Sequence, residues 1–106
     1  MRGNEDRLRG LIGLSRRAGL LSLGTDTVLR QIKSGACGIV LLDAAAAPNT
    51  QKRLRDAAQQ TDTPVCTVPE SLLDAATGQS GKMTAAVRKG TLADQLILWF
   101  KTAEEA

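Results

Sequence analysis

Histidine is absent from the 106 residues of the chain. Its absence removes the side chain that most often serves as a general base near neutral pH and most often binds a metal. The serines therefore have no histidine partner, and the scattered acidic residues are mostly close to expected helix starts, where capping explains them. The sequence favours a non-enzymatic protein that holds no metal and no cofactor.

Cysteine is rare, and long apolar runs are absent. Cys37 and Cys66 each lie beside a short apolar run, and a zinc site would need two further ligands. We therefore interpret both as reduced core thiols. No run approaches the roughly 18 apolar residues of a membrane span, and no signal peptide is visible. These absences predict a cytoplasmic protein without membrane contact.

Aromatic residues are limited to Trp99 and Phe100. Proteins that bind single-stranded RNA stack its bases on several exposed rings, and this chain has one pair close to its end. We interpret the pair as anchors of the core. Any bound RNA would then be recognised through shape, phosphates and groove edges.

Positive charge is modest and unevenly distributed. The net charge is +3, and residues 1–35 hold seven Arg or Lys against three acidic residues. A polyanion would dock most readily on this first third of the chain. A solvated cationic surface explains the same distribution equally well.

Helical and strand patterns alternate along the chain. Apolar residues recur at helical spacing in 4–18, 25–34, 49–60, 71–78 and from 91 onward, and short apolar runs occupy 20–23, 39–42, 65–68 and 83–88. We expect Asn49 or Thr50 to cap the third helix, and Ser71 with Asp74 to form a capping box on the fourth. The alternation predicts an α/β protein, a three-layer αβα sandwich around a mixed sheet, as one domain over 1–106 with its core at about 4–101.

The segment from Gly24 to Leu42 is the most informative part of the sequence. Gly24 opens a short amphipathic helix that carries Arg30 and Lys33 on its polar side. Glycine lets the backbone lie close to a bulky partner, and a helix start presents free N–H groups and partial positive charge. The pattern indicates nucleic acid. Many αβ units also begin and end with glycine for structural reasons alone.

The segment 78–84, GQSGKMT, is similar to the end of the phosphate-binding loop found in proteins that hydrolyse nucleotides. That loop requires a glycine where Ala76 stands, and Ser or Thr where Met83 stands, to hold magnesium. The segment also leads into a strand instead of opening a helix. The sequence therefore argues against nucleotide hydrolysis.

Four phrases, in this order, carry a resemblance to a known family. They are LIGLSRRAGLLSLGTDTVLRQIKSG at 11–35, IVLL followed by DAAAAPNT, PVCTVPESLLDAATG at 64–78, and MTAAV. Over about residues 8–100 the chain resembles the kink-turn RNA-binding ribosomal protein superfamily, above all its short bacterial, ribosome-associated members. The resemblance implies a four-stranded mixed sheet between helices. It also implies structured RNA as the partner, ribosomal RNA or a kink-turn, in company with ribosomal or ribonucleoprotein components.

The positions that match the family's RNA-binding residues hold different residue types in this chain. The family has Asn or Lys two positions after the glycine, then Glu or Gln, and Lys three further on; here these are Asp26, Thr27 and Arg30. Arg30 is suited to guanine or phosphate. Asp26 brings negative charge yet can accept from a base amino group, whereas Thr27 is too short to copy Glu or Gln. Helix capping explains Asp26 and Thr27 equally well.

The loop before the last strand is the second element that the resemblance implies. Its polar residues suit phosphate contact, and Arg16, Arg17 and Lys33 either extend the basic surface or complement helix ends. The family usually has an acidic residue near Ala45, and Asp43 is the closest one here. The candidate RNA-binding residues are Gly24, Thr25, Asp26, Thr27, Arg30, Lys33, Gln79, Ser80, Gly81, Lys82, Met83, Arg16 and Arg17.

The alternative is a protein-interaction or assembly module that kept the fold and lost specific RNA recognition. We expect a monomer.

Overall fold

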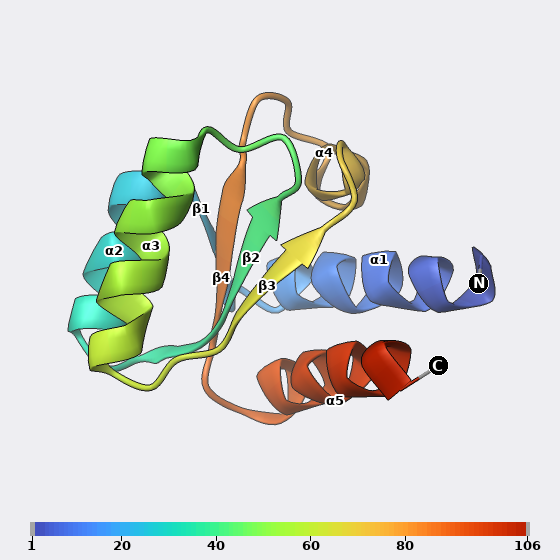
Figure 1. The fold of residues 1–106 in the computed structure, drawn as a ribbon. Helices are drawn as coiled ribbons and strands as arrows, with labels where there is room; N and C mark the ends of the chain where they lie inside the picture. Colours follow the sequence, from blue (N-terminus) through green and yellow to red (C-terminus); the bar gives the residue numbers. More distant parts are fainter. Residues whose placement is uncertain (1, 106) are drawn as a thin grey trace.

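Helices and strands alternate along the chain (Figure 1). The structure is a computed structural model that describes residues 2–105, with side chains described over 5–103. The elements are α1 (Arg2–Arg17), β1 (Leu21–Leu23), α2 (Thr25–Lys33), β2 (Cys37–Asp43), α3 (Pro48–Gln60), β3 (Val65–Val68), α4 (Leu72–Thr77), β4 (Thr84–Arg88) and α5 (Thr91–Glu105).

The four strands form one mixed sheet in the order β1-β4-β2-β3. β2 and β3 are parallel, while β4 is antiparallel to both β1 and β2. Helices α2 and α3 cover one face of this sheet, and α1, α4 and α5 cover the other (Figure 1). The predicted three-layer αβα sandwich is confirmed.

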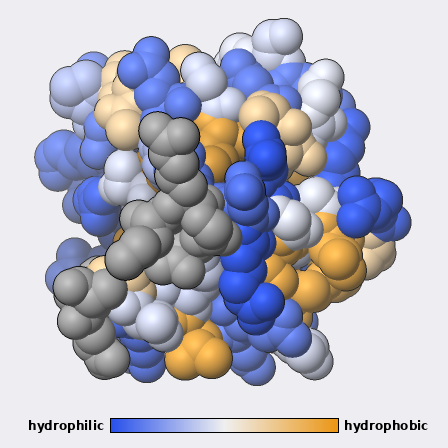
Figure 2. Space-filling view, turned by 90° about the vertical axis from the view of Figure 1, so that its right-hand side faces the viewer, coloured by the Kyte–Doolittle hydropathy of each residue, from blue (hydrophilic) through white to orange (hydrophobic). Residues whose placement is uncertain are grey.

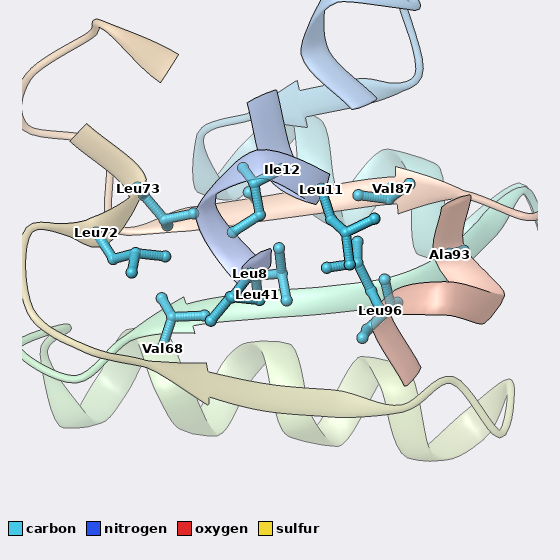
Figure 3. Close-up of a cluster of buried hydrophobic side chains, with 12 residues drawn as sticks. Leu8, Leu11, Ile12, Leu41, Val68, Leu72, Leu73, Val87, Ala93 and Leu96 are labelled. Carbon is cyan, nitrogen blue, oxygen red and sulfur yellow. The ribbon is translucent and has the colours of Figure 1, made fainter. Parts of the chain in front are cut away.

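Two clusters of buried side chains lie on the two faces of the sheet. In the larger one, Leu8, Leu11 and Ile12 of α1 pack over the sheet, as their helical spacing predicted (Figure 3). Helices α4 and α5 add further apolar side chains to this cluster, and Trp99 and Phe100 pack against it with ring centroids 5.0 Å apart. Both rings are partly buried, so the interpretation of the pair as core anchors is confirmed in part. The smaller cluster joins α2 and α3 to the sheet through Val28, Ile32, Cys37, Val40, Leu42, Leu54, Ala58 and Ala86.

A bulge in β2 decides which face Cys37 reaches. Ile39 belongs to the larger cluster and Val40 to the smaller one, as strict alternation requires. Alternation would put Cys37 with Ile39, but Cys37 belongs to the smaller cluster because the pairing with β4 shifts register between Cys37 and Ile39. Gly38 lies at this shift. A Cβ there would be 2.7 Å from the Cβ of Ala93 and 3.0 Å from the Cα of Lys89, so only glycine fits.

Two predicted helix caps are wrong. Helix α3 begins at Pro48 after an extended Ala47, without a side-chain cap, so neither Asn49 nor Thr50 is its cap. Proline suits this first position because it lacks the N–H that the helix start cannot use. At α4, Ser71 is left-handed with φ 69° and its side chain makes no capping bond, so the box with Asp74 does not form.

On the face shown in Figure 2, apolar residues form patches separated by hydrophilic ones. The large hydrophobic residues that are exposed within the described side chains are Leu14, Met83 and Leu98. No helix among the described residues is both long and apolar enough to cross a membrane.

Candidate nucleic-acid interface

Three separate segments meet at one end of the sheet. β1 and β2 end there and β4 begins there, since Leu23 pairs with Ala85 and Leu42 pairs with Thr84. The starts of α2 and α3 and the loop between α4 and β4 lie at this end, which is uppermost in Figure 1. They border an open surface hollow of about 310 Å³. Its lining residues, called the rim below, are Gly24, Thr25, Ala47, Thr50, Gly81, Lys82, Met83 and Thr84.

The backbone conformation at position 24 requires glycine. Its φ of 99° and ψ of 142° lie where residues with a side chain are strained. A Cβ at this position would meet no atom within 4 Å, so the chain itself leaves the space beside Gly24 open. The Gly24 N–H donates to the Thr84 carbonyl oxygen at 3.1 Å, and this bond fixes the start of α2 against the start of β4. The glycine therefore presents bare backbone at a fixed place on the rim.

Positive potential gathers at the rim from two helix starts and one lysine. Neither α2 nor α3 has a side-chain cap, so the N–H groups in the first turn of each helix receive no capping bond, although Pro48 at the start of α3 has no N–H to offer. Each start also carries the positive end of a helix dipole. Lys82 is exposed beside them and forms no ion pair within the described side chains. The exposed Asp26 in the first turn of α2 partly offsets this positive charge.

Asp43 holds the surroundings of the rim together. Its side chain is 2% exposed, and its carboxylate accepts hydrogen bonds from the N–H groups of Ala45 at 2.7 Å and Ser71 at 3.1 Å. Its own N–H donates to the Met83 carbonyl oxygen at 2.9 Å. The carboxylate is thus directed into the protein and is unavailable to a ligand. It links the β2–α3 connection, the start of α4 and the loop before β4.

Arg30 and Thr27 form a pair on the exposed side of α2. The Arg30 guanidinium donates from Nη2 to the Thr27 hydroxyl oxygen, at 3.4 Å. Residues three apart lie on the same side of a helix, so the pair follows from the spacing. The ion pairs among the described side chains are Arg9–Asp6 and Lys52–Asp56, and neither involves Arg30. The Arg30 charge therefore faces solvent without neutralisation.

Several predicted residues lie away from the rim. Lys33 is at the far end of α2, about 12 Å from Thr25 at 1.5 Å per residue. Arg16 and Arg17 precede β1, at the end of that strand opposite Gly24. Gln79 and Ser80 are exposed in the loop before β4 but do not line the hollow. The structure thus brings Gly24, Thr25, Gly81, Lys82 and Met83 together at the hollow. Asp26, Thr27 and Arg30 follow beside it on α2, whereas Lys33, Arg16 and Arg17 lie away from it.

Three rim residues were missed by the sequence reasoning. One is Thr84, the first residue of β4. The other two are Ala47 and Thr50. They come from the start of α3, which the parallel β2–β3 unit places next to the start of α2. A proline directly after a buried strand was the available signal, because proline favours the first position of a helix. Thr50 had been predicted as a cap instead.

The cysteines lie on opposite faces of the sheet: Cys37 belongs to the smaller buried cluster, and Cys66 packs against the larger one. Burial raises the pKa of the Cys37 thiol to about 11, against smaller opposing effects from its hydrogen bond to the Ile39 carbonyl oxygen and from Lys89. Such a thiol is neutral and unreactive near pH 7. Within the described residues, no group of three or more Cys, Asp or Glu side chains is arranged to hold a metal.

The fold recurs in solved structures. A Bacillus halodurans C protein of unknown function superposes with a TM-score of 0.84 at 25% identity, over 89% of this chain and 96% of that one. A Giardia lamblia 15.5kD RNA binding protein superposes with a TM-score of 0.79 at 18% identity, over 97% of this chain and 89% of that one. No protein-family model and no curated protein matches the chain. The fold is therefore shared with a protein that binds RNA.

Proposed function

We propose that this chain is a non-enzymatic RNA-binding protein that docks its rim onto structured RNA, ribosomal RNA or a kink-turn. One observation carries the proposal: two uncapped helix starts, the bare backbone of Gly24 and Lys82, which has no ion pair among the described side chains, converge on one hollow. Phosphate oxygens are the natural partners of such a group of donors. The RNA-binding Giardia protein of the same fold adds support.

Phosphates would lie against the helix starts and Lys82. Helix N–H groups donate to phosphate oxygens without carrying sequence information, so these contacts fix the register of the protein on the RNA. The number of cations near the rim is small, which predicts release of about two to five counterions on binding. The logarithm of affinity should therefore fall with salt at a modest slope.

Base recognition falls to residues beside the hollow. Arg30 is exposed and can donate to O6 and N7 of a guanine, and Asp26 can accept from a base amino group. Met83 is 39% exposed and offers an apolar surface on which a base can lie. A kink with accessible base edges satisfies all three side chains, whereas a regular A-form groove does not admit them.

The alternative is a protein-interaction or assembly module that keeps the fold without RNA recognition. Asp26 and Thr27 favour it, since both depart from the family's RNA-binding pattern. Under that reading, Arg30 and Lys82 would be no more important for RNA retention than cations elsewhere on the surface.

A titration with two RNAs separates these functions. The purified protein is titrated at ~100 mM salt with a kink-turn RNA and with a matched duplex whose G·A pairs are replaced by Watson–Crick pairs. The proposal predicts tighter binding to the kink-turn. Equally weak binding to both RNAs would leave a phosphate-binding surface only, and no binding to either would favour the protein-interaction module.

A further inference from the structure

We propose that Thr27 is a positioning residue that holds the Arg30 guanidinium toward the start of α2, ready to contact RNA. The inference rests on the proposed function, because the position of Arg30 matters to a ligand only if Arg30 reaches one. It assigns a role to a residue that is too short to replace the long polar side chain the family has at this position.

The geometry supports this role. Arg30 lies toward the end of the nine-residue α2, and its guanidinium reaches back to the Thr27 hydroxyl oxygen, at 3.4 Å. Helical side chains lean toward the start of their helix, so this contact extends their ordinary direction. The guanidinium is therefore held nearer to the rim than a freely rotating arginine would be. Thr27 is half-buried and β-branched, so its own side chain is restricted as well.

A hydroxyl suits this task better than a carboxylate. It takes one of the five guanidinium N–H donors and leaves the others for guanine or phosphate. A Glu at the same position would also orient the arginine, but it would neutralise the charge that attracts RNA. Holding a long side chain in place before binding removes part of the ordering cost that binding must otherwise meet.

The first experiment uses the free protein and needs no RNA. ¹⁵N relaxation of the Arg30 Nε–H group is measured in the wild type and in Thr27→Val and Thr27→Ser variants, with Lys33→Arg as a marker for an unheld arginine on the same helix. The inference predicts a more restricted Arg30 in the wild type and in Thr27→Ser than in Thr27→Val. Equal mobility in all three proteins would overturn it.

The second experiment measures binding of the kink-turn RNA. Thr27→Val should weaken binding about threefold to tenfold, Thr27→Ser should restore it, and Thr27→Val should add nothing in an Arg30→Ala background. A full effect of Thr27→Val in that background would overturn the inference. So would an unchanged affinity in Thr27→Val while Arg30→Ala weakens binding. If Arg30→Ala itself has no effect, the proposed base contact fails, while the relaxation result still decides whether Thr27 holds Arg30.

Discussion

The backbone N–H of Ser71 donates a hydrogen bond to the buried carboxylate of Asp43 at 3.1 Å, across 28 positions of sequence. Ser71 has a left-handed backbone conformation, and its N–H bonds to the side chain of the last residue of β2. The same carboxylate accepts from Ala45 at 2.7 Å. One side chain thereby satisfies two backbone donors and joins the β2–α3 connection, which borders the rim, to the connection before α4.

Replacing Asp43 should therefore destabilise the protein. Asp43→Ala removes the acceptor of two partly buried hydrogen bonds, which costs about 1–3 kcal/mol in the free energy of unfolding. Asp43→Asn keeps one acceptor oxygen and should cost less. Denaturant unfolding measures both. Glu70→Gln, on an exposed neighbouring carboxylate, is the control and should change stability by no more than about 0.5 kcal/mol. Wild-type stability in Asp43→Ala would contradict the role given to this bond.

Gly38 should not tolerate a side chain. Gly38→Ala forces the new Cβ to within 2.7 Å of the Ala93 Cβ, and the two backbones must separate by a shift of β2 or α5. We expect a loss of about 1–3 kcal/mol in the free energy of unfolding.

Gly10→Ala is the matched control, since a Cβ there meets nothing within 4 Å and the residue lies inside α1. It should stabilise the protein by up to about 1 kcal/mol, because alanine is the better helix former. Equal effects of the two substitutions in chemical denaturation would show that the close approach at Gly38 is unimportant.

Alkaline pH should weaken the fold through Cys37. Its folded pKa is about 11 against an ordinary value of 9.0, so between these pH values the unfolded state loses the thiol proton first. The stabilisation that the folded state gains by keeping this thiol protonated is fully present below pH 9. It is lost as the pH rises through 11, and the total loss in unfolding free energy is about 2–3 kcal/mol. The difference in unfolding free energy between wild type and Cys37→Ala, followed from pH 8 to 11, isolates it. A difference that does not change with pH would be evidence against a buried neutral thiol.

Asp26 should act against indiscriminate RNA binding. Its exposed carboxylate lies in the first turn of α2, where it repels phosphates that approach the helix start. Asp26→Asn should raise affinity for the Watson–Crick duplex about twofold to fivefold at low salt, and should reduce selectivity for the kink-turn. Filter binding or fluorescence anisotropy with both RNAs measures this, and Asp94→Asn on α5 is the control. An unchanged duplex affinity would mean that Asp26 lies outside the interface.

Local sequence patterns predicted the elements and their inward faces because both follow from residue spacing. Leu8 and Ile12 are buried where helical periodicity expected them, and β3 spans the predicted Val65–Val68. The misses depend on contacts between distant segments. The bulge at Gly38 reverses the face of Cys37, and the acceptor of the Ser71 N–H comes from another element. Local sequence carries little information about such contacts.

The candidate site divides in the same way. Gly24 and Lys82 were predicted from a helix start and from a loop, and the sheet brings them together. Ala47 and Thr50 joined them only through the strand order, which no short stretch of sequence encodes. Arg16 and Arg17 were included on charge alone, and the fold separates them from the rim by the length of β1.

The central claim is that the rim is the RNA-binding surface, and one pair of lysine substitutions tests it most directly. Lys82→Gln removes a charge from the rim, and Lys101→Gln removes an equal charge from the exposed surface of α5. Affinity for the kink-turn RNA is measured over a range of salt concentrations for both variants and the wild type. The account predicts that Lys82→Gln weakens binding and lowers the salt slope by about one, while Lys101→Gln leaves both close to the wild type. Equal losses in the two variants, or none in Lys82→Gln, would contradict it.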